Sequence, residues 1–249
     1  MKITALAITY NEATHLQRYL DEMQFADEII IVDSFSTDDT LKIAEANNAK
    51  VIQREFKNFS DQKNFALSQA SHDWVAFFDP DEALSEDLIN ELKSLKSKTP
   101  EAAAYSVRRQ YYFMDKKMKY SGFQTDWVVR FFNRKYCSYN GNLVHETLDI
   151  NGTTSKLKHR LDHYSYKGFD AFNDKLTHYA TLQADKLYEK NVRPNAYHFL
   201  FRPWYRFWHQ YLIRLGILDG KEGFILAYCQ AFSVFKRYLI LWAKYRRLH

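Results

Sequence analysis

The chain has 249 residues, of which 46% are hydrophobic and 26% charged, with only 7 glycines and 4 prolines. This composition excludes a disordered or low-complexity protein, and the length suits a single core or one core with an appendage. Cys137 and Cys229 stand apart without CxxC spacing, which indicates a reducing compartment and neither a disulfide framework nor structural zinc. Charge is uneven: residues 193–249 carry ten Lys or Arg against two carboxylates, a net charge of +8, which leaves −3 for residues 1–192.

The apolar stretches predict a cytoplasmic chain. The first apolar run is too short for a signal peptide and meets polar residues by Thr9. The longest nearly apolar stretch, residues 223–235, falls short of the roughly 20 residues that span a bilayer. We therefore expect no helix that crosses a membrane.

Strand and helix patterns alternate in the first third of the chain. Predicted strands cover residues 3–9, 28–33, 50–53 and 73–78, and helical patterns follow the first three of them. The second strand is a β-branched run of the kind buried in a parallel sheet. Repeated βα units with right-handed crossovers predict an α/β fold with a mostly parallel, doubly wound sheet flanked by helices.

The later segments have a different pattern. Residues 104–113, 127–132 and 143–150 indicate further strands, which extend the sheet or form a wall beside it. From Gly168 onward the period is helical, over residues 169–190, 196–215 and 220–247. We expect an α/β domain over residues 1–165 and a helical, basic and aromatic C-terminal region over residues 166–249.

Polar side chains follow three of the predicted strands. In open α/β sheets, ligands bind outside the carboxyl ends of the strands, so these side chains are the first candidates for a site. Acidic groups that converge there repel one another unless a cation or hydrogen-bond donors lie between them. The residues are Thr9, Asn11 and Glu12 after the first strand, Asp33 at the end of the second, and Asp79-Pro80-Asp81-Glu82 after the fourth.

Asp79 and Asp81 form an Asp-x-Asp turn. Two carboxylates on a tight turn can present oxygens to Mg²⁺ or Mn²⁺, which prefer oxygen ligands and bridge phosphates. The alternative is a solvated turn in which Glu82 and Ser85 cap the next helix. The position of the turn directly after a buried strand favours the metal site.

The other candidates also have two interpretations. Asp33 can accept a hydrogen bond from a nucleobase or cap the helix that follows, although Asp38 is better placed for capping. Thr9, Asn11 and Glu12 are expected to contact base and ribose, with Asn11 alternatively an ordinary N-cap. Lys63 can pair with a phosphate or be a surface lysine.

Four of these segments, in order and spacing, resemble the family 2 glycosyltransferases, which have a GT-A fold and invert the anomeric centre. They are Thr9-Tyr10-Asn11-Glu12, residues 28–40, Gln62-Lys63-Asn64 and residues 78–82. Residues 142–148, 163–166, 216–223 and the Lys236-x-Tyr238-x-x-x-Trp242 pattern resemble, more narrowly, the lipopolysaccharide core β-1,4-glucosyltransferases. Pro80 departs from the pattern, because Ala or Thr is more usual between the two aspartates.

The resemblance implies roles for the donor-side residues. Asp33 should contact the base, Asp79 the ribose or the metal, Asp81 the metal and Lys63 the diphosphate. His163 is a further candidate for the metal or phosphate site, against the alternative of a structural histidine. The implied cofactor is a divalent cation, Mg²⁺ or Mn²⁺, and the implied donor is a UDP-sugar.

Inversion by direct displacement needs a general base near the acceptor oxygen. Glu146 and Asp126 are the candidates, and Glu146 is favoured because His145 beside it can position the acceptor or the carboxylate. Arg130 is expected with His145 on the acceptor side. A structural histidine at the sheet edge is the other interpretation of His145.

The resemblance implies transfer of a hexose, glucose from UDP-glucose, to an inner-core heptose of lipopolysaccharide. Two alternatives stay open: transfer of another sugar to a glycolipid or protein acceptor, and a non-catalytic nucleotide- or phospholipid-binding protein on the same scaffold.

Residues 197–209 place aromatic rings almost all round a helix, with arginines between them. Trp and Tyr favour the membrane interface, and Arg attracts anionic head groups. This predicts peripheral docking on the inner face of the inner membrane, where a lipid-linked saccharide acceptor would be met. The alternatives are a helical cap packed on the α/β domain and nucleic-acid binding, which the resemblance disfavours.

Overall fold

The computed structural model describes residues 1–140, 147–164 and 168–248. The chain packs as two compact units. An α/β unit consists of Met1–Arg109 with Trp127–His163, and a helical unit consists of Gln110–Asp126 with Tyr164–His249. The sequence predicted one division at residue 165, whereas residues 110–126 pack with the C-terminal helices.

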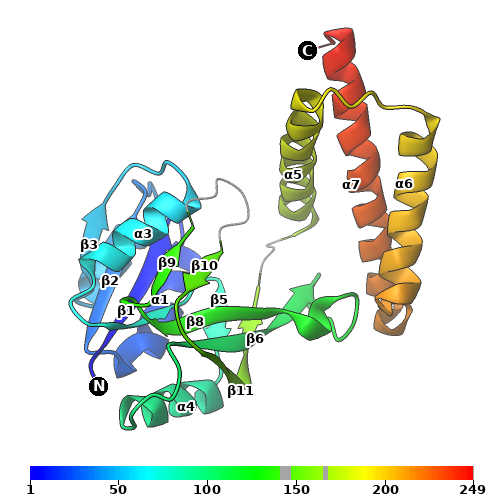
Figure 1. The fold of residues 1–249 in the computed structure, drawn as a ribbon. Coiled ribbons are helices and arrows are strands. Elements are labelled where there is room, and N and C mark those ends of the chain that lie inside the picture. Colours follow the sequence, from blue (N-terminus) through cyan, green and yellow to red (C-terminus); the bar gives the residue numbers. More distant parts are fainter. Residues whose placement is uncertain (141–146, 165–167, 249) are drawn as a thin grey trace. The chain divides into compact units, whose positions relative to one another are not determined.

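The α/β unit begins with a parallel sheet, as predicted. Its first strands lie in the order β3-β2-β1-β4 (Figure 1), and each neighbouring pair runs parallel. Their bounds are Ile3–Thr9 for β1, Glu28–Asp33 for β2, Lys50–Gln53 for β3 and Trp74–Phe77 for β4. The intervening helices are α1 (Ala13–Glu22), α2 (Thr40–Ala46) and α3 (Phe59–Gln69), with a short 3₁₀ turn at Met23–Phe25.

The sheet continues with antiparallel strands. Beyond β4 the order is β8-β6-β11-β5, and β8 runs antiparallel to both β4 and β6. The bounds are Glu82–Leu84 for β5, Ala104–Phe113 for β6, Trp127–Asn133 for β8 and Thr154–His163 for β11. The remaining elements are α4 (Glu86–Lys96), β7 (Lys116–Lys117), which pairs with β6, a 3₁₀ turn at Phe123–Thr125, and the small pair β9 (Cys137–Tyr139) and β10 (Leu148–Ile150).

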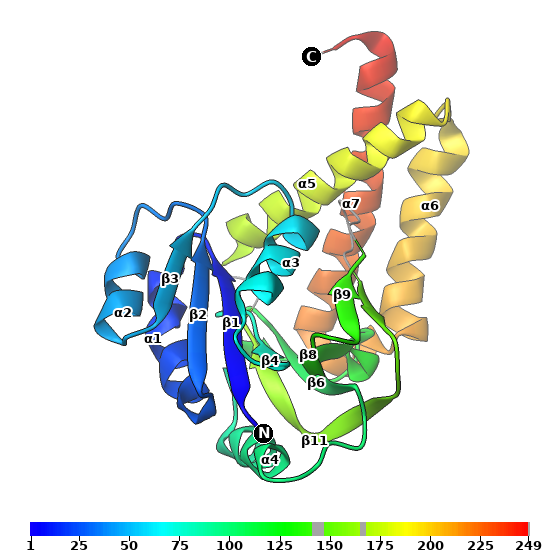
Figure 2. The ribbon, with the colours of Figure 1, turned by 60° about the vertical axis from the view of Figure 1, so that its left-hand side comes forward.

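The core of the α/β unit lies on both faces of the sheet (Figure 2). Alternate residues of a strand point to opposite faces, and β1 follows this rule. Ile3, Ala5 and Ala7 join the cluster that contains Leu16, Tyr19 and Leu20 of α1. Leu6 joins the other cluster, which contains Ala66 and Leu67 of α3. Both faces of the parallel part are thus covered by helices, as such sheets require.

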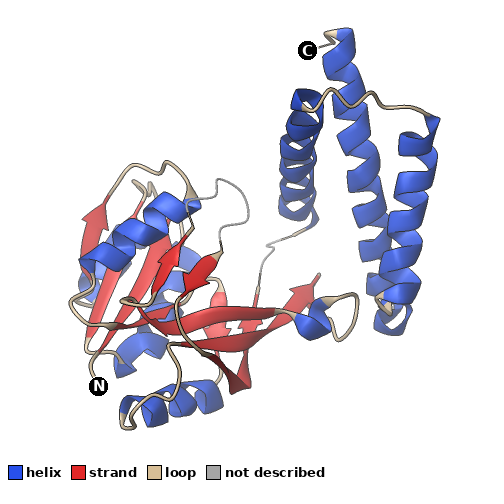
Figure 3. Cartoon of the chain, viewed as in Figure 1, coloured by secondary structure: helices blue, strands red, loops and turns tan. Residues whose placement is uncertain are grey.

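The helical unit contains three long helices (Figure 3). They are α5 (Phe169–Glu189), α6 (Ala196–Trp208) and α7 (Gly220–Arg246). The predicted helix over 196–215 is shorter than expected, because a π-helical turn at His209–Ile213 and a 3₁₀ turn at Gly216–Asp219 follow α6. The chain packs closely here: a Cβ on Gly223 would lie 1.9 Å from the carbonyl oxygen of Gly216.

The buried carboxylate of Asp219 joins the two chain segments of the helical unit. Its Oδ1 accepts a hydrogen bond from the backbone N–H of Lys119 at 2.9 Å, and its Oδ2 accepts one from the Ser121 hydroxyl at 2.7 Å. Gln210 Nε2 donates to the Ser121 carbonyl at 2.6 Å. These bonds explain why residues 110–126 belong to the helical unit.

Within the described residues, one helix is long and apolar enough to cross a membrane. It covers Gly216–Arg246, with an 18-residue window of mean hydropathy 1.3, of which 33% is buried inside the structure. The apolar stretch 223–235 lies inside this longer helix, and the expectation that no helix crosses a membrane stays a prediction. Core helices of soluble proteins share this length and composition.

Candidate active site

The carboxyl ends of β1, β2 and β4 meet at one edge of the sheet. Thr9 and Asp33 are paired in the parallel register of β1 and β2, and Asp79 follows the end of β4. Parallel register therefore brings the candidates from separate parts of the chain to one edge.

Asp33 is fully buried and fixed by hydrogen bonds. Thr9 Oγ1 donates to Oδ1 at 2.9 Å, and the backbone N–H of Ser36 donates to Oδ2 at 2.8 Å. The Ser36 hydroxyl also donates to Oδ1 at 2.5 Å. The geometry of Thr9 favours orienting Asp33, and contact of either side chain with a nucleotide stays a prediction.

Asn11 joins the loops that follow β1 and β2. Its backbone N–H donates to Ser36 Oγ at 2.8 Å, and its Oδ1 accepts the N–H of Thr37 at 2.8 Å. Its φ of 56° is left-handed, a region that Asn tolerates better than most residues. The N-cap of α1 is Glu12, so the alternative in which Asn11 caps that helix is wrong. The N–H of Glu12 donates to Thr40 Oγ1 at 2.8 Å, which fixes the same pair of loops.

A buried ion triad lies at the end of β4. Arg130 Nε donates to Glu82 Oε2 at 2.7 Å, and Arg130 Nη2 donates to Glu82 Oε1 at 2.7 Å and also to Asp79 Oδ2. Glu82 is 0% exposed and Arg130 is 4% exposed. Arg130 reaches the turn because β8 is antiparallel to β4 and therefore begins near the point where β4 ends.

Asp79 is held in its ionised form. Burial by itself would raise the pKa of Asp79, but nearby cations outweigh this effect and hold the pKa at about 2. In order of effect, the basic side chains that lower it are Arg130, Lys63, His163 and Arg109. The two carboxylates in turn raise the pKa of Arg130 above its usual value, against the opposing effect of burial.

Asp81 lies close to a histidine. His163 Nε2 lies 3.3 Å from Asp81 Oδ2, with side chains that are 16% and 31% exposed respectively. The pairing of β11 with β5 brings them together, because His163 is opposite Glu82 in the antiparallel register. Across the described part of the chain, no three His, Cys, Asp or Glu side chains form a metal-binding cluster.

Lys63 lies among buried groups, and its side chain is not a solvated surface lysine as the alternative supposed. The residue is 6% exposed, and Nζ lies 5.3 Å from the centre of the Tyr139 ring. Its neighbours in the sequence are anchored: Gln62 Nε2 donates to Ser34 Oγ at 3.2 Å, and Asn64 exchanges two 2.9 Å hydrogen bonds with the Tyr139 backbone. The Gln62-Lys63-Asn64 segment thus fixes Lys63 near Asp79.

The acceptor-side candidates are less well defined by the structure. Glu146 and His145 lie outside the described residues. Asp126 directly precedes β8 and ends a 3₁₀ turn, where its N–H donates to the Phe123 carbonyl at 3.3 Å. The guanidinium of Arg130 binds the two carboxylates of the triad, which favours a role in holding them over contact with an acceptor.

The model of the family described as glycosyl transferase family 2 matches residues 4–160, more than half of the chain. The matched range contains Thr9, Asp33, Asp79, Asp81 and Arg130, whereas His163 lies just beyond it. The chain belongs to glycosyl transferase family 2. It is therefore a glycosyltransferase, as the resemblance implied.

Relatives at lower identity extend over nearly the whole chain. The lipopolysaccharide core biosynthesis glycosyltransferase LpsC of Rhizobium meliloti is 26% identical, over 96% of this chain and 94% of its own length. An uncharacterized glycosyltransferase of Rickettsia conorii, RC0292, is 28% identical, over 95% of this chain and 88% of its own.

A crystal structure of S. aureus TarS residues 1–349 in complex with UDP-GlcNAc is similar with a TM-score of 0.52. It is 14% identical over 100% of this chain and 93% of that one. At that identity the likeness shows the fold alone, and it confirms the GT-A type of α/β fold.

A second set of side chains supports the Asp-x-Asp turn of this family 2 enzyme. Arg18 Nη2 donates to the Pro80 carbonyl at 2.8 Å, and Arg18 Nε lies 3.5 Å from Glu22 Oε1. Glu22 Oε2 accepts the Leu84 N–H at 3.1 Å. Sequence reasoning missed Glu22 and Arg18, and only their i, i+4 spacing on the helix signalled a pair.

Burial raises the pKa of Glu22 to about 7, while the Leu84 N–H and Arg18 lower it by less. A raised pKa means that folding favours the protonated form. The contribution of Glu22 to the free energy of unfolding is therefore full below the pKa that Glu22 has in the unfolded chain. It is lost as the pH rises through about 7.

We predict that Glu22→Gln removes this pH dependence, because the amide oxygen still accepts the Leu84 N–H and cannot ionise. Relative to the original chain, the variant should gain up to about 3 kcal/mol in free energy of unfolding as the pH rises. Urea denaturation at about pH 5 and about pH 8 measures the difference, with exposed Glu45→Gln as the control. A Glu22→Gln variant with the original pH dependence would contradict the prediction.

Proposed function

We propose that this enzyme transfers a hexose, glucose from UDP-glucose, with inversion to an inner-core heptose of lipopolysaccharide. The observation that carries the proposal is the strand-end cluster of the family 2 domain, in which the Asp81–His163 pair lies beside the buried triad of Asp79, Glu82 and Arg130. LpsC, which matches this chain along nearly its full length, supports the lipopolysaccharide acceptor.

Asp81 and His163 are the groups that would hold a divalent metal. Mg²⁺ and Mn²⁺ sites in nucleotide enzymes commonly use one or two protein ligands, and substrate phosphates supply the rest. Asp79 is engaged by Arg130, whereas Asp81 and His163 face each other at 3.3 Å. When bound, such a metal would neutralise charge on the leaving diphosphate.

The remaining donor-side residues fit the same proposal. Lys63 is assigned to the diphosphate. After Arg130, it is the cation that lowers the pKa of Asp79 most. Asp33 is assigned to the base, since a carboxylate has lone pairs beyond those that Thr9 and Ser36 occupy. Asn11 and Glu12 hold the loops on which base and ribose would rest.

The proposal assigns the general base to Glu146, with Asp126 as the alternative. Glu146→Gln should lower transfer by at least about a hundredfold, because the acceptor hydroxyl loses its proton acceptor. Release of UDP from UDP-glucose, with heptose-terminated core lipopolysaccharide as acceptor, measures the rate. NMR of the product reports the anomeric configuration, which should be inverted.

Asp126→Asn is the matched control and should keep transfer. Calorimetric UDP binding in both variants separates loss of catalysis from loss of folding. An active Glu146→Gln with an inactive Asp126→Asn would move the base to Asp126. A chain that releases no UDP from any donor would contradict the transferase itself.

We also propose that the helical unit docks on a membrane surface through an aromatic face. Its residues on α7 are three or four positions apart in the sequence, with a basic residue at each end and aliphatic or aromatic residues between them. It consists of Lys221, Phe224, Tyr228, Phe232, Phe235, Leu239, Trp242 and Arg246. Phe224, Tyr228 and Phe232 are 47%, 63% and 48% exposed.

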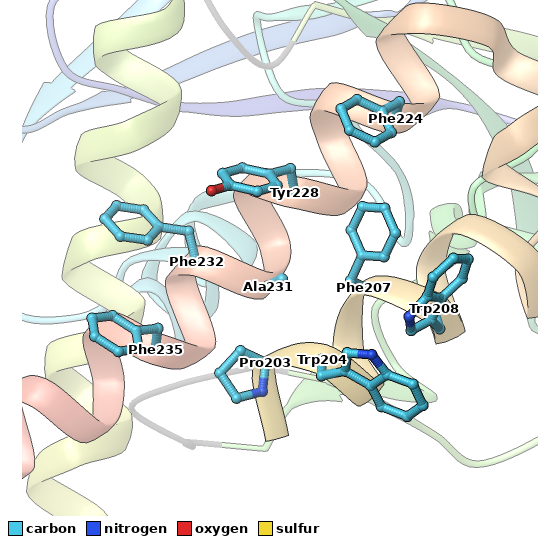
Figure 4. Close-up of a pocket in the computed structure, with 9 residues that line it drawn as sticks. All are labelled: Pro203, Trp204, Phe207, Trp208, Phe224, Tyr228, Ala231, Phe232 and Phe235. Atoms are coloured by element: carbon cyan, nitrogen blue, oxygen red, sulfur yellow. The ribbon is translucent and has the colours of Figure 1, made fainter. Parts of the chain in front are cut away.

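The helix α6 contributes the second wall of this face. Pro203, Trp204, Phe207 and Trp208 of α6 and the facing residues of α7 line an apolar groove of about 640 Å³ (Figure 4). Trp204 is 62% exposed. Contact of this apolar ring with water is unfavourable, and an interfacial lipid environment would replace that contact.

The docking proposal predicts that Trp204→Ser combined with Phe232→Ser weakens vesicle binding at least about tenfold, because two apolar anchors are removed. Co-sedimentation with phosphatidylcholine vesicles, with and without phosphatidylglycerol, measures it. Exposed Tyr136→Ser is the control and should change nothing. Alkaline carbonate should release the bound protein, and retention would indicate that α7 spans the bilayer. Equal binding by the double variant would contradict docking through this face.

A further inference from the structure

A cluster of arginines lies on the side of α7 that is opposite the aromatic face. Tyr228 and Arg237 are nine residues apart, which at about 3.6 residues per turn places them half a turn apart. Gln230 and Arg237 are seven residues apart and share that opposite side. Arg206 reaches it from α6, where its Nη2 donates to Gln230 Oε1 at 3.0 Å.

These arginines have no anionic partner among the residues that the structure describes. Residues 193–218 contain no Asp or Glu, and α6 therefore offers none. Throughout the described residues, no ion pair involves Arg202, Arg206 or Arg237. Among the residues that the structure describes, the buried Nε of Arg237 has no hydrogen-bond partner.

Three lysines of the same unit are bound by their neighbours. Lys116 pairs with Glu222 at 2.6 Å, and Lys244 pairs with Asp185 at 2.6 Å. Lys236 Nζ donates to Asn173 and Thr177, each at 2.7 Å. These three lysines have partners, whereas Arg202, Arg206 and Arg237 have no ion pair among the described residues.

The arginines also lower one another's pKa. Burial lowers the pKa of Arg206, and the charges of Arg237 and Arg214 lower it further. Burial likewise lowers the pKa of Arg237; the charge and the hydrogen bond of Tyr238 oppose this effect, and Arg202 lowers the pKa further. Half-buried like charges repel, and a bound anion would turn this repulsion into attraction.

We propose that Arg206 and Arg237, with Arg202 at the rim, bind a phosphate group on this side of the helical unit. Planar guanidinium groups match phosphate oxygens with paired hydrogen bonds, and the unpartnered Nε of Arg237 supplies one such donor. This site shares no residue with the strand-end cluster of the α/β unit and does not depend on the proposed transfer. The phosphate can belong to a lipid head group or to a soluble phosphate compound.

Calorimetric titration of the full chain with inorganic phosphate tests the site. EDTA and constant ionic strength exclude metal-dependent binding and general screening. Arg237→Gln and Arg206→Gln should each raise the dissociation constant at least about tenfold, whereas Arg193→Gln, which removes the guanidinium stacked 4.0 Å from the Tyr245 ring, should leave it unchanged.

The same variants distinguish a binding role from a structural one. Without phosphate, Arg237→Gln should unfold at the same temperature as the original chain or a higher one, because repulsion is removed. No saturable binding by the original chain, or unchanged binding by both variants, would overturn the proposal. The proposal would also be overturned if Arg237→Gln unfolded at a lower temperature while Arg206→Gln and exposed Arg202→Gln both still bound phosphate.

Vesicles then identify the source of the phosphate. If a lipid head group occupies the site, which would place this side of α7 and not the aromatic face on the membrane, Arg206→Gln and Arg237→Gln lose phosphatidylglycerol-dependent co-sedimentation together with phosphate binding. If a soluble phosphate compound occupies it, the variants lose phosphate binding alone. Both results support the anion site.

Discussion

The buried pairing of Arg130 with Glu82 and Asp79 is the interaction on which the strand-end cluster depends. Glu82 has no contact with solvent, and a buried carboxylate is tolerated only when a cation and hydrogen bonds satisfy it. Removing one partner of such a buried pair typically costs about 3–5 kcal/mol, because the other charge is left uncompensated. The triad therefore ties β8 to the turn after β4.

The same pairing gives the two aspartates of the turn different contacts. Asp79 is directed to Arg130, while Asp81 faces His163 at 3.3 Å. Arg18 fixes the Pro80 carbonyl from the other side at 2.8 Å. A turn fixed by these contacts presents Asp81 in a defined position, which is what a metal site completed by a diphosphate requires.

The sequence predicted the parallel half of the fold because its strands are buried apolar runs ended by polar residues. It placed β2 and β3 at their observed bounds for this reason. It missed β11, where charged residues alternate and only Leu157 and Leu161 are buried. It could not pair Arg130 with Glu82, because contacts between segments far apart in the chain leave no local pattern.

The candidate site was predicted in part for the same physical reason. Strand-end residues of a parallel sheet can be located from the strands alone, so Thr9, Asp33 and Asp79 were found. Side chains that support them from α1, such as Glu22 and Arg18, depend on packing that the sequence does not display. The arginine cluster of the helical unit requires the pairing of α6 with α7, which the sequence likewise leaves open.

The most direct test is the gain in UDP affinity that Mn²⁺ produces, measured by calorimetry in the original chain and in Asp81→Asn. The account predicts a gain of at least about tenfold that the variant loses, while exposed Asp149→Asn keeps it. Equal UDP affinity with and without the metal, or an Asp81→Asn variant that retains the gain, would contradict it.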